Sequence, residues 1–567
     1  MRRPVVWLSI VIAFAAAAAG VRTAAPRFYD DDPIARVPES RSAANAKPLS
    51  IELFFEYSYN LFVVANRQPS NTKAGNVNTV DEVPDSSWFT NRIGVETLTP
   101  ERIARGVNSE KGPVPEKWTL LREKSVGTNP GFTARDANGE VWFLQFDAPA
   151  NPEGSTGAVE VATKLFWALG YNQVETFITT FDPAKADIDP DATVKRPSGA
   201  RTKFSRDDIS RVLERAARNP DGTYRASAGR TLPGKILGPF RYTGTRSDDP
   251  NDLVAHEHRR ELRVLRVFGA WTNLVDWKAG NTLDTLVEEN GRALVKHFLQ
   301  DVGSTFGMAN NPHEWDMGFE HFYEPDPSRR RLLTLGFDLS PWQTVPYKEY
   351  PSIGLFEGDE FDPTTWKPQT PVQPYIELRA DDAFWAARKV MLFTDDLIRA
   401  AVHSGQYSDP AAEAHLAAVL GKRRDKIGRT YLPAVNPIVD PKIDAAGQLT
   451  FGNAAVDAGF AEKPTAYHAA WFRFDNATGA TQPAGQTENA TPAMAMPSAL
   501  AATSSGAFVQ VDVTADSTQY QSWKEPARLV FRRTAGGWKL VGLERMPNAK
   551  PAVPPPAQQP AAAAGKK

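Results

Sequence analysis

The order in which hydrophobic patterns follow one another constrains this chain most. Residues 131–147 predict two strands joined at Asn138-Gly139, a dipeptide typical of tight hairpins. Residues 155–170 then predict an amphipathic helix that stops at Gly170. Helical patterns dominate from a long helix beginning near Asp252 to about residue 430, and alternating strands return after 440. This order predicts an α+β fold followed by a small all-β domain, more sandwich-like than barrel-like.

Length and composition narrow the classes of protein. A chain of 567 residues exceeds what one hydrophobic core supports and allows about two to four domains. Its formal net charge is −2, whereas nucleic-acid binding needs a basic face, so nucleic acid is not an expected partner. The chain has no cysteine, which excludes disulfides and lipid attachment through a thiol.

The N-terminus has the pattern of a secretory signal. Arg2 and Arg3 precede an apolar run from Val5 to Ala19, and small residues follow. We therefore predict a signal peptide over residues 1–25 and a periplasmic or extracellular location. An uncleaved anchor is the alternative, although the run is shorter than the roughly 20 apolar residues that span a bilayer. No membrane span is expected after the signal is removed.

Polar residues interrupt an otherwise apolar stretch at residues 273–307. Asp276, Lys278 and Asn281 follow a helical pattern, and Asp301 comes at the end of the second of two predicted strands. A carboxylate can orient an attacking hydroxyl, a lysine can steady a transferring phosphoryl group, and amide and carboxylate oxygens can hold Mg²⁺. The pattern therefore indicates phosphoryl transfer. The alternative is that Asp276 and Asn281 only form a turn and that Lys278 is a solvated charge.

These motifs resemble those of protein kinases. "DWKAGN" (276–281) resembles the catalytic-loop motif D-x-K-x-x-N, and "DVG" (301–303) resembles the metal-binding D-F-G. "VWFLQFD" (141–147) resembles the strand that presents the ATP lysine, and "GAVEVATKLFWALG" (157–170) resembles the helix that supplies its glutamate partner. The chain is most similar to atypical bacterial kinase-like proteins of the HipA and spore-coat CotH kind.

The resemblance implies a role for each residue of the polar stretch. Asp276 would be the catalytic base, and Lys278 would steady the transferring phosphoryl group. Asn281 and Asp301 would hold Mg²⁺, which makes ATP and Mg²⁺ the implied cofactors.

The resemblance also implies a nucleotide site on the earlier strands. Gly127 and Gly131 belong to a partial glycine-rich loop, "VGTNPG" (126–131), and Gln145 falls where the ATP lysine is expected. Glu160 would be the carboxylate partner of that position. In the alternative reading, Glu160 and Lys164 form an ordinary ion pair between successive helical turns.

Several departures separate the chain from conventional protein kinases. Leu274 and Val275 stand where His-Arg is usual, and no A-P-E segment is visible. Gln145 can donate a hydrogen bond to phosphate but brings no charge. Lys164 or Lys235 could supply the missing cation, and replacing Gln145 with lysine is expected to strengthen nucleotide binding.

The resulting prediction is a bilobal protein-kinase-like domain followed by a β domain, in an exported protein. It would bind Mg-nucleotide and transfer phosphate to a hydroxyl on an envelope protein, lipid or glycan. A non-catalytic pseudokinase scaffold or binding module is the alternative. The predicted segments are a signal peptide (1–25), an N-terminal extension (26–117), an N-lobe (118–240) with an insertion over 183–235, a mostly helical C-lobe (241–440), a β-sandwich-like domain (441–548) and a disordered Pro/Ala tail (549–567).

Overall fold

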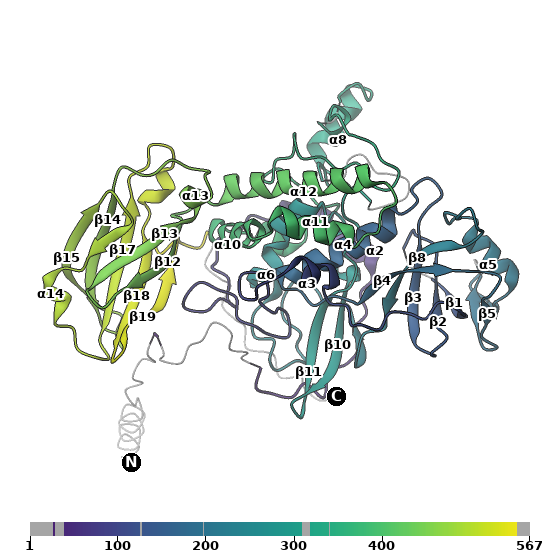
Figure 1. Ribbon diagram of the computed structural model, residues 1–567, viewed down its shortest axis with the longest axis horizontal. Helices are drawn as coiled ribbons and strands as arrows, with labels where there is room; N and C mark the ends of the chain where they lie inside the picture. Colours follow the sequence, from purple (N-terminus) through teal and green to yellow (C-terminus); the bar gives the residue numbers. More distant parts are fainter. Residues whose placement is uncertain are drawn as a thin grey trace, which may run out of the picture.

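The computed structural model describes residues 27–28, 39–124, 127–196, 198–308, 318–339 and 341–552. This part of the chain is a mixed α+β structure with several sheets, so the predicted fold class is confirmed at that level. Figure 1 places a six-stranded sheet at one end, two C-terminal sheets at the other end, and helices between them. The predicted signal peptide and residues 553–567 of the predicted tail lie outside the described residues.

The six-stranded sheet contains the predicted hairpin. All neighbouring strands are antiparallel except β1 and β5, which run parallel. Gly139 turns the chain at φ 83° between β2 and β3, a backbone conformation that favours glycine. The strands lie in the order β4 (Thr176–Phe181), β8 (Tyr224–Arg230), β3 (Val141–Phe146), β2 (Gly131–Arg135), β1 (Thr119–Glu123) and β5 (Asp187–Ile188).

The expected insertion over residues 183–235 is wrong for part of that range. Strand β8 belongs to the sheet itself, where it pairs with both β3 and β4. Its sequence, "YRASAGR", buries small residues such as Ala226 and Ala228, so it lacks the large apolar side chains that mark a central strand. The rest of the range holds helix α5 (Arg206–Leu213) and the short strands β6 (Thr193–Lys195) and β7 (Arg201–Lys203).

Helix α4 (Gly154–Leu169) contacts strands β3, β4 and β8 of this sheet and is almost wholly buried. It ends at Gly170, as predicted, with φ 126°. A Cβ at Gly170 would come within 2.2 Å of the Phe89 ring, so only glycine fits there. Trp88 and Phe89 are buried, and Phe89 fixes the preceding loop to the end of α4.

The expected long helix near Asp252 is broken into shorter pieces. Asp252 accepts hydrogen bonds from the Arg246 amide and from Arg259 and His256. These contacts hold residues 246–259 as a loop with short turns. Leu262 and Phe268 are buried in the core. The helices of this part are η2 (His256–His258), α6 (Arg260–Arg263), α7 (Leu265–Thr272), α9 (Gln373–Ile376), α10 (Ala380–Met391), α11 (Asp395–His403) and α12 (Pro410–Tyr431).

A three-stranded sheet positions the polar stretch. Strands β10 (Thr282–Glu289) and β11 (Arg292–Leu299) form a hairpin across Asn290-Gly291, and β9 (Lys235–Gly238) pairs with β10. Because the first residue of β10 lies opposite the last residue of β11, the chain entering the hairpin meets the chain leaving it.

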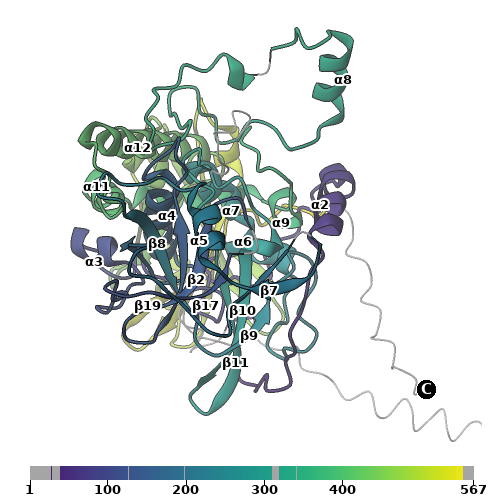
Figure 2. The ribbon, with the colours of Figure 1, turned by 90° about the vertical axis from the view of Figure 1, so that its right-hand side faces the viewer.

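Helix α2 (Leu53–Phe62) stands at the edge of the helical part, beside α9 (Figure 2). Other described helices are η1 (Val64–Asn66), α3 (Pro100–Arg105), η3 (Ala279–Asn281), α8 (Pro325–Leu333) and η4 (Pro341–Gln343). In the described ranges, no helix is both long enough and apolar enough to cross a bilayer.

The C-terminal strands form two sheets around an apolar core. Val509, Val511 and Val513 alternate on the buried face of β17, and Trp471 and Trp523 are fully buried beside the same core. One sheet has the order β12 (Ile438–Ile443), β13 (Gln448–Asn453), β16 (Ala493–Ala495). The other has the order β15 (Thr481–Asn489), β14 (Tyr467–Phe474), β17 (Phe508–Ala515), β18 (Ala527–Thr534), β19 (Gly537–Glu544), and the short helices α13 (Ala454–Asp457), α14 (Ser498–Ala501) and η5 (Gln521–Lys524) connect strands.

Candidate functional site

The hairpin β10–β11 brings the predicted polar residues together. The backbone amides of Gln300 and Asp301 both donate to the carbonyl of Asn281, at 3.0 and 3.1 Å. The side-chain amide of Asn281 in turn donates to the carbonyl of Asp276 at 2.8 Å. Asp276, Asn281 and Asp301 are therefore parts of one hydrogen-bonded cluster, although they are separated by up to 25 residues (301 − 276) in the sequence.

Lys278 forms an ion pair with Asp276 within this cluster. Its ammonium lies 2.7 Å from the Asp276 carboxylate, and both side chains are 18% exposed. Burial lowers the pKa of Lys278, but the charge of Asp276, its hydrogen bond with Lys278 and the contact with Tyr57 together outweigh burial and raise the pKa overall. Lys278 therefore remains a cation at neutral pH, and the Asp276 carboxylate is held next to it.

Asn281 and Asp301 have a donor set that fits Mg²⁺. The Asn281 nitrogen is engaged, so its side-chain oxygen is the atom that it can offer to a metal. Asp301 is exposed, and one of its oxygens accepts the Gly303 amide at 3.0 Å, which orients the carboxylate. Mg²⁺ takes one or two carboxylates and completes its shell with water and phosphate oxygens. Within the described ranges there is no cluster of three or more His, Asp or Glu residues that could bind a metal by itself.

The predicted nucleotide residues converge on a lysine that sequence reasoning missed. Lys124 continues the β1–β2 pairing, because its amide donates to the Gly131 carbonyl at 3.0 Å. Gly131 pairs on its other side with Gln145. The three residues thus form one row across three strands, and the Lys124 ammonium donates to Gln145 Oε1 at 2.8 Å. Gly127 lies over the same ammonium, since a Cβ there would be 3.3 Å from Lys124 Nζ.

Gly131 makes this row possible because it has no side chain. A Cβ at position 131 would lie 2.2 Å from the Leu144 carbonyl oxygen and 3.3 Å from Lys124 Cδ. The Lys124 side chain can therefore cross the Gly131 position to reach Gln145. No signal in the sequence alone marks Lys124, because its neighbour is set by strand register and not by a motif.

The Lys124 ammonium also interacts electrostatically with Asp301. Burial lowers the pKa of Lys124, and the negative charge of Asp301 acts in the opposite direction. The same carboxylate belongs to the Asp276 cluster, so Asp301 connects the row on the six-stranded sheet to the cluster on the hairpin. Gly303 keeps this connection close, because a Cβ there would lie 2.5 Å from the Val159 side chain of α4.

Glu160 lies elsewhere and adopts the alternative pairing. Its carboxylate is 2.7 Å from the Lys164 ammonium and accepts a hydrogen bond from Thr176 Oγ1 at 2.7 Å, all in the buried face of α4. Burial lowers the pKa of Lys164, and Glu160 opposes that shift. Lys164 is thus already paired with Glu160. Lys235 is exposed on β9, in a different sheet from Gln145, so neither lysine considered from the sequence replaces the expected cation.

Two residues of α2 complete the cluster and were also missed. Glu56 Oε1 accepts the Ala279 amide at 2.6 Å, and the Lys278 ammonium lies 5.6 Å from the centre of the Tyr57 ring. Burial raises the pKa of Glu56, whereas its hydrogen bond from Ala279 and the Lys278 charge lower it. Residues 26–117 were predicted only as an N-terminal extension and no site residue was expected there, because the sequence of α2 contains no sign of this long-range contact.

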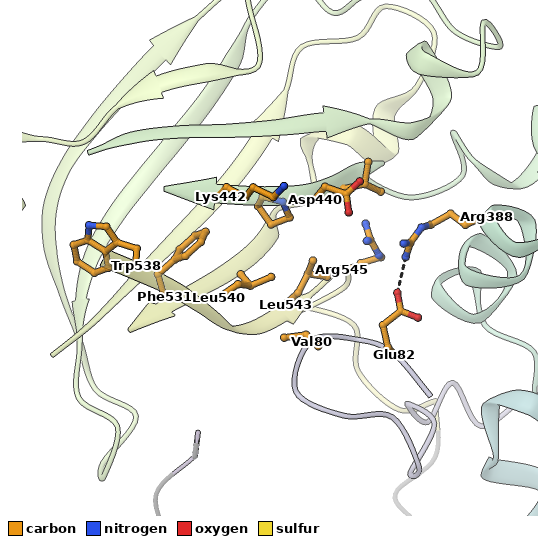
Figure 3. Close-up of a pocket in the computed structure, with 12 residues that line it drawn as sticks. Val80, Glu82, Arg388, Asp440, Lys442, Phe531, Trp538, Leu540, Leu543 and Arg545 are labelled. Carbon is orange, nitrogen blue, oxygen red and sulfur yellow. Dashed lines mark hydrogen bonds and ion pairs between the residues drawn. The ribbon is translucent and has the colours of Figure 1, made fainter. Parts of the chain in front are cut away.

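A separate hollow of about 360 Å³ lies between the C-terminal strands and α10 (Figure 3). Arg388 pairs there with Glu82 at 2.9 Å, and Arg545 donates to Asp81 at 3.1 Å. Phe531, Trp538 and Leu540 form its apolar wall. It contains none of the residues predicted for catalysis or nucleotide binding.

Comparison with known proteins gave structural neighbours only. No family model matches the chain, and no curated protein matches it. A crystal structure of the Golgi casein kinase with Mn/ADP bound is similar at a TM-score of 0.31 and 13% identity, covering 70% of this chain and 94% of that chain. A second structure of the Golgi casein kinase has a TM-score of 0.29 and 12% identity over the same shares of the two chains.

Proposed function

We propose that this chain is an atypical kinase-like protein that binds Mg-nucleotide between the six-stranded sheet and the hairpin β10–β11. The observation that supports this most is the position of Lys124. It donates to Gln145, which occupies the expected lysine position, and it interacts with the charge of Asp301, which belongs to the predicted metal pair. A cation and a metal-binding carboxylate are thus available on two sides of one site.

Lys124 answers the main objection that arises from Gln145. A neutral glutamine would leave the phosphates with hydrogen bonds of roughly 0.5–1.5 kcal/mol, whereas bonds to a charged group contribute about 1.5–3 kcal/mol. With Lys124 beside Gln145, the charge comes from the end of β1 instead of from β3. Gln145 then has a positioning role, because it holds the Lys124 ammonium in place.

The Asp276 cluster supports phosphate transfer to a hydroxyl group. Asp276 would accept the proton of the acceptor hydroxyl, and the ion pair with Lys278 holds that carboxylate in position. Asn281 and Asp301 would hold Mg²⁺, which when bound offsets the charge of the phosphates. The acceptor would be a protein, lipid or glycan of the cell envelope, provided that residues 1–25 direct export as their sequence predicts.

One observation favours a non-catalytic nucleotide-binding protein as the second candidate. Glu160 pairs with Lys164 and has no hydrogen bond to Lys124 or Gln145 in the described chain, so the carboxylate that usually orients the phosphate-binding lysine is used elsewhere. Such a protein would bind Mg-nucleotide without turning it over.

The test is a thermal shift of the purified chain with ATP and Mg²⁺. The parent should be stabilised by ATP and Mg²⁺ together and by neither alone, because binding to the folded state raises its melting temperature. Asp301→Asn should lose the shift. Asp396→Asn, at an exposed position of α11, is the matched control and should retain it. An equal shift in Asp301→Asn would contradict the proposal.

Loss of phosphate transfer in Asp276→Asn, with Mg-ATP binding retained, would show that the protein is a catalyst and not only a nucleotide-binding protein. No transfer by the parent to any hydroxyl, with binding intact, would identify the non-catalytic form.

A further inference from the structure

The segment that follows α5 crosses the end of the six-stranded sheet at which the proposed nucleotide site lies. Arg211, in the last turn of α5, forms an ion pair with Glu123 at the end of β1, with the two charged groups 2.7 Å apart. Further along, the Ala217 amide donates to the carbonyl of Asp147, directly after β3, at 2.8 Å. Because β1 and β3 hold the two ends of the phosphate-binding row, residues 211–217 pass the end of that row.

Helix α5 itself covers the opposite face of this sheet. Its residues Ile209 and Val212 belong to the same apolar core as Phe132 of β2. Figure 1 shows α5 on the side of the sheet that lies away from the central helices. Side chains alternate between the two faces along a strand, so Glu123 points toward α5 and Lys124 points toward the nucleotide site. A side chain of this segment can therefore approach the nucleotide site only around the end of the sheet.

Arg215 makes this approach. Its Nη2 donates to the carbonyl of Thr128, in the partial glycine-rich loop, at 2.6 Å. Gly127 of the same loop lies over the Lys124 ammonium, so the guanidinium and the ammonium meet at one loop. A guanidinium has five N–H donors, and in the described chain the Arg215 side chain makes no other hydrogen bond and no ion pair. Its charge and most of its donors are thus available to a ligand.

The charges around this loop favour an anion as that ligand. Burial lowers the pKa of Lys124, the charge of Asp301 raises it, and the charge of Arg215 lowers it again. The two cations are therefore close enough to repel each other, and Asp301, which offsets them, is the residue expected to hold Mg²⁺. A phosphate group at the loop would relieve the repulsion, and the planar guanidinium can donate to two of its oxygens at once.

We propose that Arg215 is a second cation of the nucleotide site, which holds the glycine-rich loop through Thr128 and donates to the phosphate oxygens of a nucleoside triphosphate. The inference rests on the proposed function, and it gives the segment inserted between β7 and β8 a part in that function. Arg215 positions the phosphates and takes no part in bond exchange. A polyphosphate is the ligand that fits, because both cations contribute to its binding, whereas neither contributes to the binding of an uncharged nucleoside.

Titration calorimetry of the full chain with ATP and Mg²⁺ tests this role. Arg215→Gln should bind about tenfold more weakly than the parent at low ionic strength, and the loss should shrink as added salt screens the charge. Arg215→Lys keeps the charge and should bind within about threefold of the parent. Arg218→Gln removes another exposed arginine of the same segment and is the matched control, which should bind like the parent. Because position 215 is exposed, the melting temperature without nucleotide should not change in these variants.

The outcomes separate this inference from the proposed function. Equal Mg-ATP binding by Arg215→Gln and the parent would overturn the role of Arg215 and leave the nucleotide site standing. The same conclusion would follow if Arg215→Lys bound as weakly as Arg215→Gln, or if Arg218→Gln lost as much affinity as Arg215→Gln. Absence of Mg-ATP binding in the parent itself would overturn the proposed function, and the role of Arg215 with it.

Discussion

Replacing Gln145 with lysine tests whether Lys124 already supplies the cation of the proposed phosphate site. From the sequence alone, this substitution supplies a missing charge and should strengthen nucleotide binding. The structure reverses that expectation, because the Lys124 ammonium already lies 2.8 Å from Gln145 Oε1. The new lysine would bring a second ammonium to the same place.

The size of the effect follows from the distance between the charges. Two like charges about 4 Å apart repel by about 4 kcal/mol at an effective dielectric constant of 20. Movement of the side chains or loss of one proton would relieve part of this repulsion. Gln145→Lys is therefore expected to lower the stability of the fold by on the order of 1–3 kcal/mol. The double variant Lys124→Gln/Gln145→Lys exchanges the two residues and restores one cation and one amide, so its stability should return to near that of the parent.

Nucleotide binding should require one ammonium group in the row. Titration calorimetry with ATP and Mg²⁺ should show about tenfold weaker binding for Lys124→Gln, equivalent to about 1.4 kcal/mol, with recovery in the double variant. Lys117→Gln, which removes an exposed lysine just before β1, is the matched control and should bind like the parent. If Gln145→Lys is as stable as the parent and Lys124→Gln binds ATP normally, Lys124 does not face the phosphates.

Three further predictions concern other parts of the chain. Glu160→Gln leaves the buried Lys164 without its charge partner and should lower the free energy of unfolding by about 3–5 kcal/mol. The melting temperature should fall, while the affinity of the folded protein for Mg-ATP should stay unchanged. A loss of affinity without destabilisation would mean that Glu160 belongs to the nucleotide site. Glu56→Gln should be more stable than the parent at neutral pH, because burial raises the pKa of Glu56 in the folded state above its value of 4.5 in the unfolded chain. The difference in melting temperature between the two proteins should close as the pH falls toward 4.5 and the folded parent takes up the proton. A difference that does not depend on pH would refute the prediction. Residues 1–30, fused to a reporter that is active only outside the cytoplasm, should give activity, whereas activity confined to the cytoplasm would exclude export.

The sequence predicted those parts of the site that depend on local chemistry. Asn138-Gly139 marks a turn because of its own backbone preferences, and Asp276, Asn281 and Asp301 are conspicuous as polar residues at the ends of apolar elements. The hairpin β10–β11 then brings these residues together, as expected from two adjacent strands.

The parts of the site that could not be predicted from the sequence depend on contacts between distant segments. Lys124 gains its importance from the strand register, which places Gly131 between it and Gln145. Glu56 meets Ala279 across 223 residues of chain, and nothing in either segment indicates the other. Glu160 was ambiguous for a related reason, since only the packing of α4 decides whether its carboxylate faces the sheet row or the next helical turn.

A crystal structure grown with Mn²⁺ and a non-hydrolysable ATP analogue tests the central claim most directly. The account predicts an anomalous difference peak within coordination distance of Asn281 and Asp301, with phosphate oxygens within hydrogen-bond distance of the Lys124 ammonium. Nucleotide bound elsewhere, or a metal that contacts neither Asn281 nor Asp301, would contradict it.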